Sequence, residues 1–145
     1  MLYFDTSAMV KQYLDEQDSD RYRAVWDYSV GIATSAVAYA EMMAVLHRKR
    51  RAGGITEERL RLAIGAFQGD WGRLYQVPVS SQLNPIIDEI VAKHNLRGFD
   101  AMHLASALLV DRSRRENATF VCADRPLNEI ARIEGLDTFD RPSIK

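Results

Sequence analysis

The sequence predicts an α/β fold, specifically a three-layer α/β/α sandwich with a central parallel sheet of four to five short strands. Two observations lead to this prediction. Short apolar runs alternate along the chain with longer segments of helical periodicity, which is typical of parallel strands covered by helices on both faces. The first run, residues 2–4, is a short buried strand that leads straight into a carboxylate. No repeat, low-complexity segment or linker divides the 145 residues, so we expect one domain over residues 1–145.

The boundaries of the elements follow from capping residues and from breakers. The expected strands lie at residues 2–4, 31–34, 75–79 and 119–122, with a fifth at 136–139. The expected helices lie at residues 6–15, 36–51, 57–74, 83–95 and 124–135. Another follows the turn at 18–20 and runs through residue 28, and residues 97–100 lead into one that ends at about residue 110.

In the first half of the chain, short polar side chains mark the helix starts. Thr6 and Ser7 begin the first helix, because their hydroxyls can accept the free N–H groups of its first turn. The polar turn Asp18-Ser19-Asp20 caps the second helix and Ser35 caps the third. Gly53-Gly54 ends the third helix, since glycine is favoured just past a helix end.

In the second half, Thr56 caps the fourth helix. Pro78 indicates that the third strand lies at an edge of the sheet, because proline has no N–H to donate to a neighbouring strand. Asn84-Pro85 fits the first turn of the next helix. Asp124-Arg125-Pro126 starts the last helix, and Gly135 ends it.

Charge and composition narrow the classes of function. The net charge of −1 argues against a simple electrostatic nucleic-acid binder, which is usually basic, but it does not exclude an enzyme whose acidic site is neutralised by metal ions. No apolar run approaches the roughly 20 residues of a membrane helix, and we expect no export signal. The one cysteine, Cys122, excludes an internal disulfide, which fits a cytoplasmic location. We expect Cys122 to be a small buried apolar residue.

Four acidic residues interrupt or end apolar runs, unlike the solvated acids elsewhere: Asp5, Glu41, Asp100 and Asp124. Burying an unpaired carboxylate costs, in the idealised case, on the order of tens of kcal/mol, so each of them needs a partner or a function. Three of them fall at junctions that meet at the carboxyl edge of a parallel sheet, where ligands bind, and Glu41 can reach back to that edge. Oxygen ligands suit Mg²⁺ or Mn²⁺, which activate water and stabilise charge on a phosphoryl group. The sequence therefore predicts a metal site, with Thr6 and Ser7 as accessory hydroxyls.

Each carboxylate also has a purely structural interpretation, and the spacing of the residues leaves it open. Asp100 and Asp124 can serve only as helix caps. Glu41 can pair with a basic side chain such as Arg97. His103, one turn after Asp100, fits a packed core histidine better than a catalytic base. Asp5 has no obvious structural partner.

Four segments carry a resemblance to a known family. Residues 3–8 (YFDTSA), 38–41 (AYAE), 96–105 (LRGFDAMHLA) and 120–124 (FVCAD) look like the acidic signature of PIN-domain ribonucleases. Within that family the chain most resembles the VapC-type toxins of bacterial toxin–antitoxin pairs. The resemblance covers essentially the whole length, in the right order.

The resemblance implies an endoribonuclease that depends on Mg²⁺ or Mn²⁺, forms a homodimer and is held inactive by a cognate VapB-like antitoxin. Family roles carry over to the acidic metal site and to its accessory hydroxyl, which are Asp5, Glu41, Asp100 and Asp124, with Thr6 or Ser7. The mechanism that we expect is hydrolysis of an RNA phosphodiester bond by an activated water. Three basic side chains near the site can contact substrate or antitoxin: Arg97, Arg48 and Lys49. Arg48 and Lys49 also have a structural interpretation, because positive charge stabilises the negative C-terminal end of their helix.

Other classes of protein also gather carboxylates at this edge. A phosphatase of the haloacid dehalogenase type needs a carboxylate two residues after its nucleophile, where this chain has Ser7. A receiver-type phosphotransfer domain brings several carboxylates from its first loops and a late lysine, and neither is evident. A catalytically silent PIN-like module for RNA binding or protein interaction is the non-enzymatic alternative.

Overall fold

A parallel sheet in the order β3-β2-β1-β4-β5 forms the centre of the fold, as seen in a computed structural model that describes residues 1–114 and 117–140. The strands are β1 (Leu2–Phe4), β2 (Ile32–Ser35), β3 (Tyr75–Val77), β4 (Thr119–Val121) and β5 (Asp137–Thr138). Every neighbouring pair is parallel. The predicted sheet is confirmed, and β3 lies at one edge, as Pro78 indicated. The end of the expected single domain, residues 141–145, lies outside the described residues.

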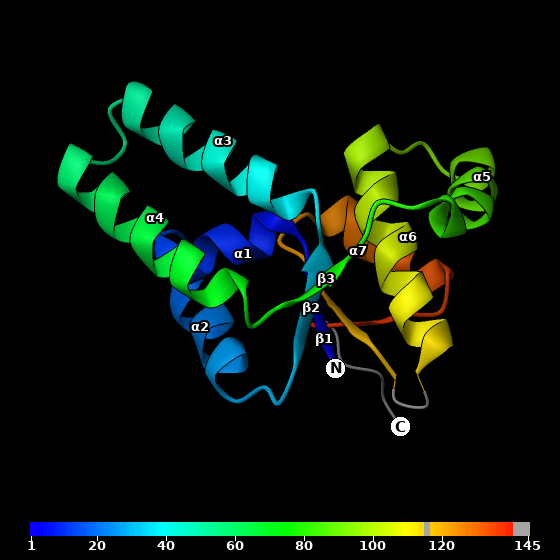
Figure 1. Ribbon diagram of the computed structural model, residues 1–145. Coiled ribbons are helices and arrows are strands. Elements are labelled where there is room, and N and C mark those ends of the chain that lie inside the picture. Colours follow the sequence, from blue (N-terminus) through cyan, green and yellow to red (C-terminus); the bar gives the residue numbers. More distant parts are fainter. Residues whose placement is uncertain (115–116, 141–145) are drawn as a thin grey trace.

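Helices cover both faces of this sheet (Figure 1). They are α1 (Thr6–Tyr13), α2 (Ser19–Asp27), α3 (Ala38–Arg51), α4 (Glu57–Trp71), α5 (Asn84–Lys93), α6 (Gly98–Ser113) and α7 (Arg125–Ile133), with a short 3₁₀ turn η1 (Ser81–Leu83). Helices α1 to α4 pack on one face, and α5 to α7 pack on the other. The three-layer α/β/α prediction is therefore confirmed. In the described part of the chain no helix is both long and apolar enough to cross a membrane.

Alternate residues of the short strands divide the core between the two faces. Tyr3 and Phe120 are fully buried among residues of α5 to α7, and their rings stack with centroids 5.8 Å apart. Phe4 and Val121 point the other way, into the cluster under α1 to α4, where Phe4 meets Trp26 edge to face. These two clusters hold β1 and β4 rigidly between them.

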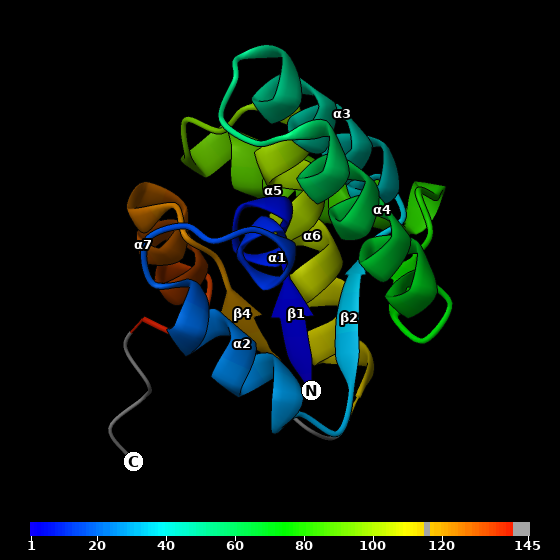
Figure 2. The same cartoon turned by 90° about the vertical axis from the view of Figure 1, so that its left-hand side faces the viewer.

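The strand order creates a switch point at β1. The chain runs outward from β1 to β2 and β3, then returns to place β4 on the other side of β1. Connections leave the carboxyl ends of β1 and β4 in opposite directions, which opens the crevice where open α/β sheets bind ligands. Figure 2 shows β4, β1 and β2 side by side, with α1 at the carboxyl end of β1. Asp5 follows β1 directly, and its N–H donates to the carbonyl of Val121, 3.1 Å away.

Two expected helix caps are wrong. Asp5, rather than Thr6 or Ser7, caps α1, because its Oδ1 accepts the N–H of Ala8 at 3.0 Å. Ser35 belongs to β2, and its Oγ accepts the N–H of Val37 in a turn before α3 begins.

Two further expected caps, Asp18 and Thr56, have different outcomes. Asp18 stands at the N-cap of α2 in a left-handed conformation with φ 65°, and its side chain caps nothing. The Thr56 cap is confirmed, because its Oγ1 accepts the N–H of Arg59 at 3.1 Å. Short polar residues therefore predict roughly where each helix starts. They predict less well which side chain accepts the free N–H groups.

Helices α3 and α4 form a hairpin that extends beyond the sheet (Figures 1 and 2). Met42 and Leu46 on α3 and Phe67 on α4 are fully buried at its base. Phe67 contacts Tyr13 of α1, with ring centroids 5.5 Å apart. This packing fixes the position of α3, which carries one wall of the site described below.

We expect Phe67→Ala to lower the free energy of unfolding by about 3–5 kcal/mol, because it removes a buried ring and leaves a cavity. Leu62→Ala, on the same helix but 48% exposed, is the control. It should change stability by no more than about 0.5 kcal/mol. Denaturant unfolding followed by circular dichroism measures both, and equal losses would contradict the packing described here.

Candidate metal centre

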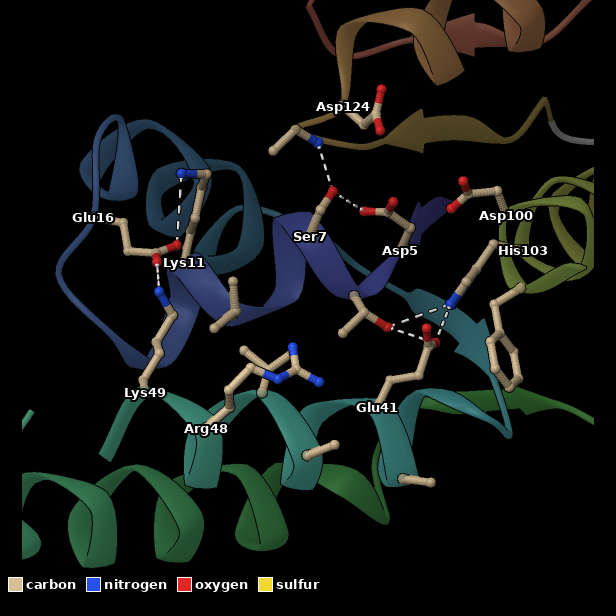
Figure 3. A pocket seen from close by; sticks show the side chains of 17 residues that line it. Asp5, Ser7, Lys11, Glu16, Glu41, Arg48, Lys49, Asp100, His103 and Asp124 are labelled. Atoms are coloured by element: carbon tan, nitrogen blue, oxygen red, sulfur yellow. Dashed lines mark hydrogen bonds and ion pairs between the residues drawn. The ribbon is translucent and has the colours of Figure 1, made fainter. Parts of the chain in front are cut away.

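The four predicted carboxylates line one pocket of about 690 Å³ at the carboxyl end of β1. Asp5 comes from the β1–α1 junction, Glu41 from α3, Asp100 from the first turn of α6 and Asp124 from the N-cap of α7. Figure 3 shows their side chains arranged around the start of α1. Residues far apart in the sequence therefore meet at the switch point of the sheet.

Asp5 is held by donors on both carboxylate oxygens. The Ser7 hydroxyl donates to Oδ1 at 2.7 Å, where the Ala8 N–H also donates, and the Cys122 thiol donates to Oδ2 at 3.0 Å. Asp5 is 5% exposed, and this burial raises its pKa, although the charge of His103 and the three donors oppose the shift. The donors fix the orientation of a carboxylate that burial alone would disfavour in its charged form.

Cys122 is a site residue that sequence reasoning missed. It is buried as expected, but it contacts Asp5 instead of acting only as an apolar filler. Burial, followed by the charge of Asp5, raises the pKa of the thiol, so the thiol keeps the proton that it donates. Its place just after β4, beside the end of β1, was the signal: neighbouring parallel strands bring their ends together.

Glu41 is held by a hydroxyl and a histidine. Thr6 Oγ1 donates to Glu41 Oε1 at 2.8 Å, and His103 Nε2 lies 2.6 Å from the same oxygen. Burial acts to raise the pKa of Glu41, but His103 and the Thr6 hydroxyl outweigh it and lower the pKa below its ordinary value. The suggested partner Arg97 is wrong for Glu41.

His103 is a core histidine, as expected, and is only 3% exposed. Its neighbours define its tautomer, because a carboxylate accepts hydrogen bonds. Nε2 therefore carries a hydrogen toward Glu41, and Nδ1 lies 3.0 Å from the Tyr3 hydroxyl. The spacing of one helical turn from Asp100 placed His103 on the face of α6 that meets the site.

Asp100 and Asp124 differ in how they are held. Asp124 caps α7, since its Oδ1 accepts the N–H of Leu127 at 3.2 Å, and it also faces the pocket. Asp100 caps nothing, so that interpretation is wrong, and it has no hydrogen-bond or ion-pair partner among the described residues. Burial raises the pKa of Asp100, and the negative charges of Asp124 and Asp5 raise it further. The carboxylates thus repel one another.

The donor chemistry fits a hard divalent cation, although the geometry is not preassembled. In the described ranges, no three His, Cys, Asp or Glu side chains stand close enough to hold a metal ion as they are. Protein donors occupy both oxygens of Asp5 and one oxygen of Glu41. The carboxylate of Asp100 and the second oxygen of Glu41 are available, because neither forms a hydrogen bond or ion pair with a described residue. Oxygen donors that repel one another are the set that Mg²⁺ or Mn²⁺ neutralises.

The other end of the pocket is basic. Lys49 lies 2.5 Å and Lys11 3.7 Å from Glu16, which therefore holds both ammonium groups at the pocket wall. Arg48 also lines the pocket and has no hydrogen-bond or ion-pair partner in the described part of the chain. In Figure 3 its guanidinium extends from α3 toward the carboxylates. Lys11 and Glu16 were not predicted, because a polar helix face and turn gave no sign of the pocket.

A second hollow of about 650 Å³ adjoins the first. Glu41, Asp100 and Asp124 line both hollows, whereas Arg97 lines only the second. The side chain of Arg97 is exposed and forms no hydrogen bond or ion pair with a residue that the structure describes. Its positive charge lowers the pKa of Asp100 slightly against the stronger effects that raise it.

Comparison with known sequences gives consistent matches. The family model described as "PIN domain" matches residues 2–133. Ribonuclease VapC45 and Ribonuclease VapC49, from the CDC 1551 / Oshkosh and ATCC 25618 / H37Rv strains of Mycobacterium tuberculosis, are each 34% identical to the chain over 110 residues. These alignments cover 76% of the chain and 76% of each relative.

Solved structures share the fold at low sequence identity. FitAcB from Neisseria gonorrhoeae superposes with a TM-score of 0.68 at 16% identity, covering 96% of both chains. VapBC2 from Rickettsia felis, bound to a DNA fragment from its promoter, gives a TM-score of 0.65 at 16% identity, covering 95% of this chain and 97% of the other.

We expect Asp100→Asn to stabilise the protein in chelator at neutral pH. The raised pKa means that the charged carboxylate disfavours folding above the ordinary pKa of aspartate, and asparagine removes that charge. The gain should disappear as the pH falls through the raised pKa and then the ordinary pKa, because Asp100 becomes protonated. Thermal melting across pH measures this effect. Asp88→Asn, an exposed position on α5, should show no gain, and a loss of stability in Asp100→Asn would contradict the repulsion.

Proposed function

The chain belongs to the PIN domain family, and from this premise we propose that it is an endoribonuclease and the toxin of a toxin–antitoxin pair. The observation that carries the proposal is the convergence of Asp5, Glu41, Asp100 and Asp124 on one pocket at the switch point of the sheet. The two curated relatives are named ribonucleases, which supports hydrolysis of RNA as the reaction.

We propose that the carboxylates hold Mg²⁺ or Mn²⁺, with Asp5 and Asp100 as the principal ligands and Glu41 and Asp124 assisting. Such an ion, when bound, lowers the pKa of water and neutralises charge on a phosphoryl oxygen. The chain's own residues prepare this site. Thr6 and His103 hold one oxygen of Glu41 and leave the other free, while Ser7 and Cys122 fix the orientation of Asp5. This pre-organisation means that binding has to order fewer side chains.

Basic side chains at the pocket ends suit the phosphates on either side of the bond that is cut. Arg48 is the strongest candidate, because its guanidinium is unpaired within the described residues and extends into the pocket. Lys49 already pairs with Glu16, so its contribution is weaker. Arg97 lines the second hollow, where its guanidinium can contact another phosphate.

The proposed partner is a cognate VapB-like antitoxin that covers the acidic pocket. The similar solved structures include VapBC2 and FitAB bound to DNA fragments, which supports this type of partner. We also propose that the chain acts as a single domain, as a homodimer and in the cytoplasm, where its RNA substrate lies.

Antitoxin-free protein should cut single-stranded RNA with Mg²⁺ or Mn²⁺ and stop when chelator is added. Asp5→Asn should lower the cleavage rate at least about a hundredfold, because it removes charge from the centre, yet asparagine can still cap α1. Asp20→Asn, an exposed acid far from the pocket, should cleave like the wild type. Gel analysis of end-labelled RNA measures the rates.

Thermal melting measures metal binding independently of cleavage. Mn²⁺ should raise the melting temperature of the wild type and of Asp20→Asn. It should raise the melting temperature of Asp5→Asn much less. Binding without any cleavage would instead favour the catalytically silent module. Equal cleavage by Asp5→Asn, or cleavage that resists chelator, would contradict the proposal.

A further inference from the structure

We propose that Phe99 stacks on a base of single-stranded RNA beside the bond that is cut. The inference rests on the proposed ribonuclease function and deepens it, since it specifies how the strand crosses the site. Three observations lead to it: the exposure of Phe99, its position in the wall of both hollows, and the positive charge in each hollow.

Phe99 is 58% exposed, although its helix α6 is otherwise largely buried on the sheet. Its neighbour Asp100 belongs to the carboxylate cluster, and Ala101 is 1% exposed. The ring therefore stands at the rim of the acidic pocket with much of its surface in water. An aromatic ring that is left in water beside a polar centre gains stability only when a partner covers it.

Phe99 forms a wall shared by the two hollows, together with Glu41, Asp100 and Asp124. Three of the four carboxylates thus border both hollows, whereas Asp5 lines only the first. A phosphodiester bond held at these carboxylates has one nucleotide in each hollow. This arrangement suits cleavage inside a strand, and it places one flanking base within reach of the Phe99 ring.

Each hollow carries a positive charge on its wall, from Arg48 in the first and from Arg97 in the second. Cations spaced along a groove with an aromatic ring between them are typical of sites that follow the backbone of a single strand and stack its bases. A base in a duplex is already stacked, so its face is unavailable to Phe99. The occupant that fits is therefore unpaired RNA.

The test is fluorescence anisotropy in chelator, where no cleavage is expected, with two probes. One is a short random-sequence single-stranded RNA, and the other is a ribose-phosphate chain of the same length without bases. The wild type should bind the first probe about 5- to 100-fold more tightly than the second, the range expected for one stacked base. Phe99→Ala should lose most of this preference, and Phe99→Trp should keep it.

Two controls separate stacking from general effects. Tyr28→Ala removes another exposed aromatic ring, 89% exposed after α2, and should bind both probes like the wild type. Arg48→Ala should weaken both probes by a similar factor, because it removes a backbone contact. Melting temperatures confirm that each variant is folded.

The proposal is overturned if Phe99→Ala keeps the wild-type preference for the base-bearing probe, or if it weakens both probes equally. It is also overturned if Phe99→Ala leaves RNA binding unchanged and weakens only the antitoxin. Base-dependent binding without cleavage in Mg²⁺ would count against the ribonuclease function but support stacking. Cleavage in Mg²⁺, combined with unchanged RNA binding by Phe99→Ala, would support the ribonuclease function and count against stacking.

Discussion

Mutual repulsion among carboxylates at the carboxyl ends of β1 and β4 is the constraint on which the rest of the site depends. Asp5 is almost fully buried. Burial raises the pKa of Asp100, and the charges of Asp124 and Asp5 raise it further. A fold that brings such groups together loses stability unless donors or cations compensate. The switch point of the sheet fixes where they meet, and the two apolar clusters keep β1 and β4 from separating.

Hydrogen-bond donors of the protein compensate part of this repulsion without closing the site. Ser7 and Cys122 satisfy Asp5, and Thr6 and His103 satisfy one oxygen of Glu41. The remaining charge faces a pocket that is open to solvent and bordered by cations. The same arrangement that weakens the empty protein therefore favours a divalent ion, because the ion removes a repulsion that the fold already contains.

Much of this structure was predictable from the sequence. The alternation of apolar runs and helical segments gave the parallel sheet, and carboxylates in apolar surroundings identified Asp5 and its companions. Side-chain contacts across the fold were harder, because no local pattern joins Cys122 to Asp5 or Lys49 to Glu16. The cap of α1 was assigned to the wrong residue because an aspartate at a strand end reaches the same N–H groups as a following hydroxyl.

The most direct test of the central claim is a crystal structure of the protein grown with Mn²⁺, using anomalous scattering to locate the ion. The account predicts an anomalous peak in the pocket, in contact with Asp5 and Asp100, at distances of roughly 2.0–2.3 Å typical of hard cations and oxygen ligands. A peak elsewhere on the protein, with Asp5 still held by Ser7 and Cys122 and no ion beside it, would contradict the account.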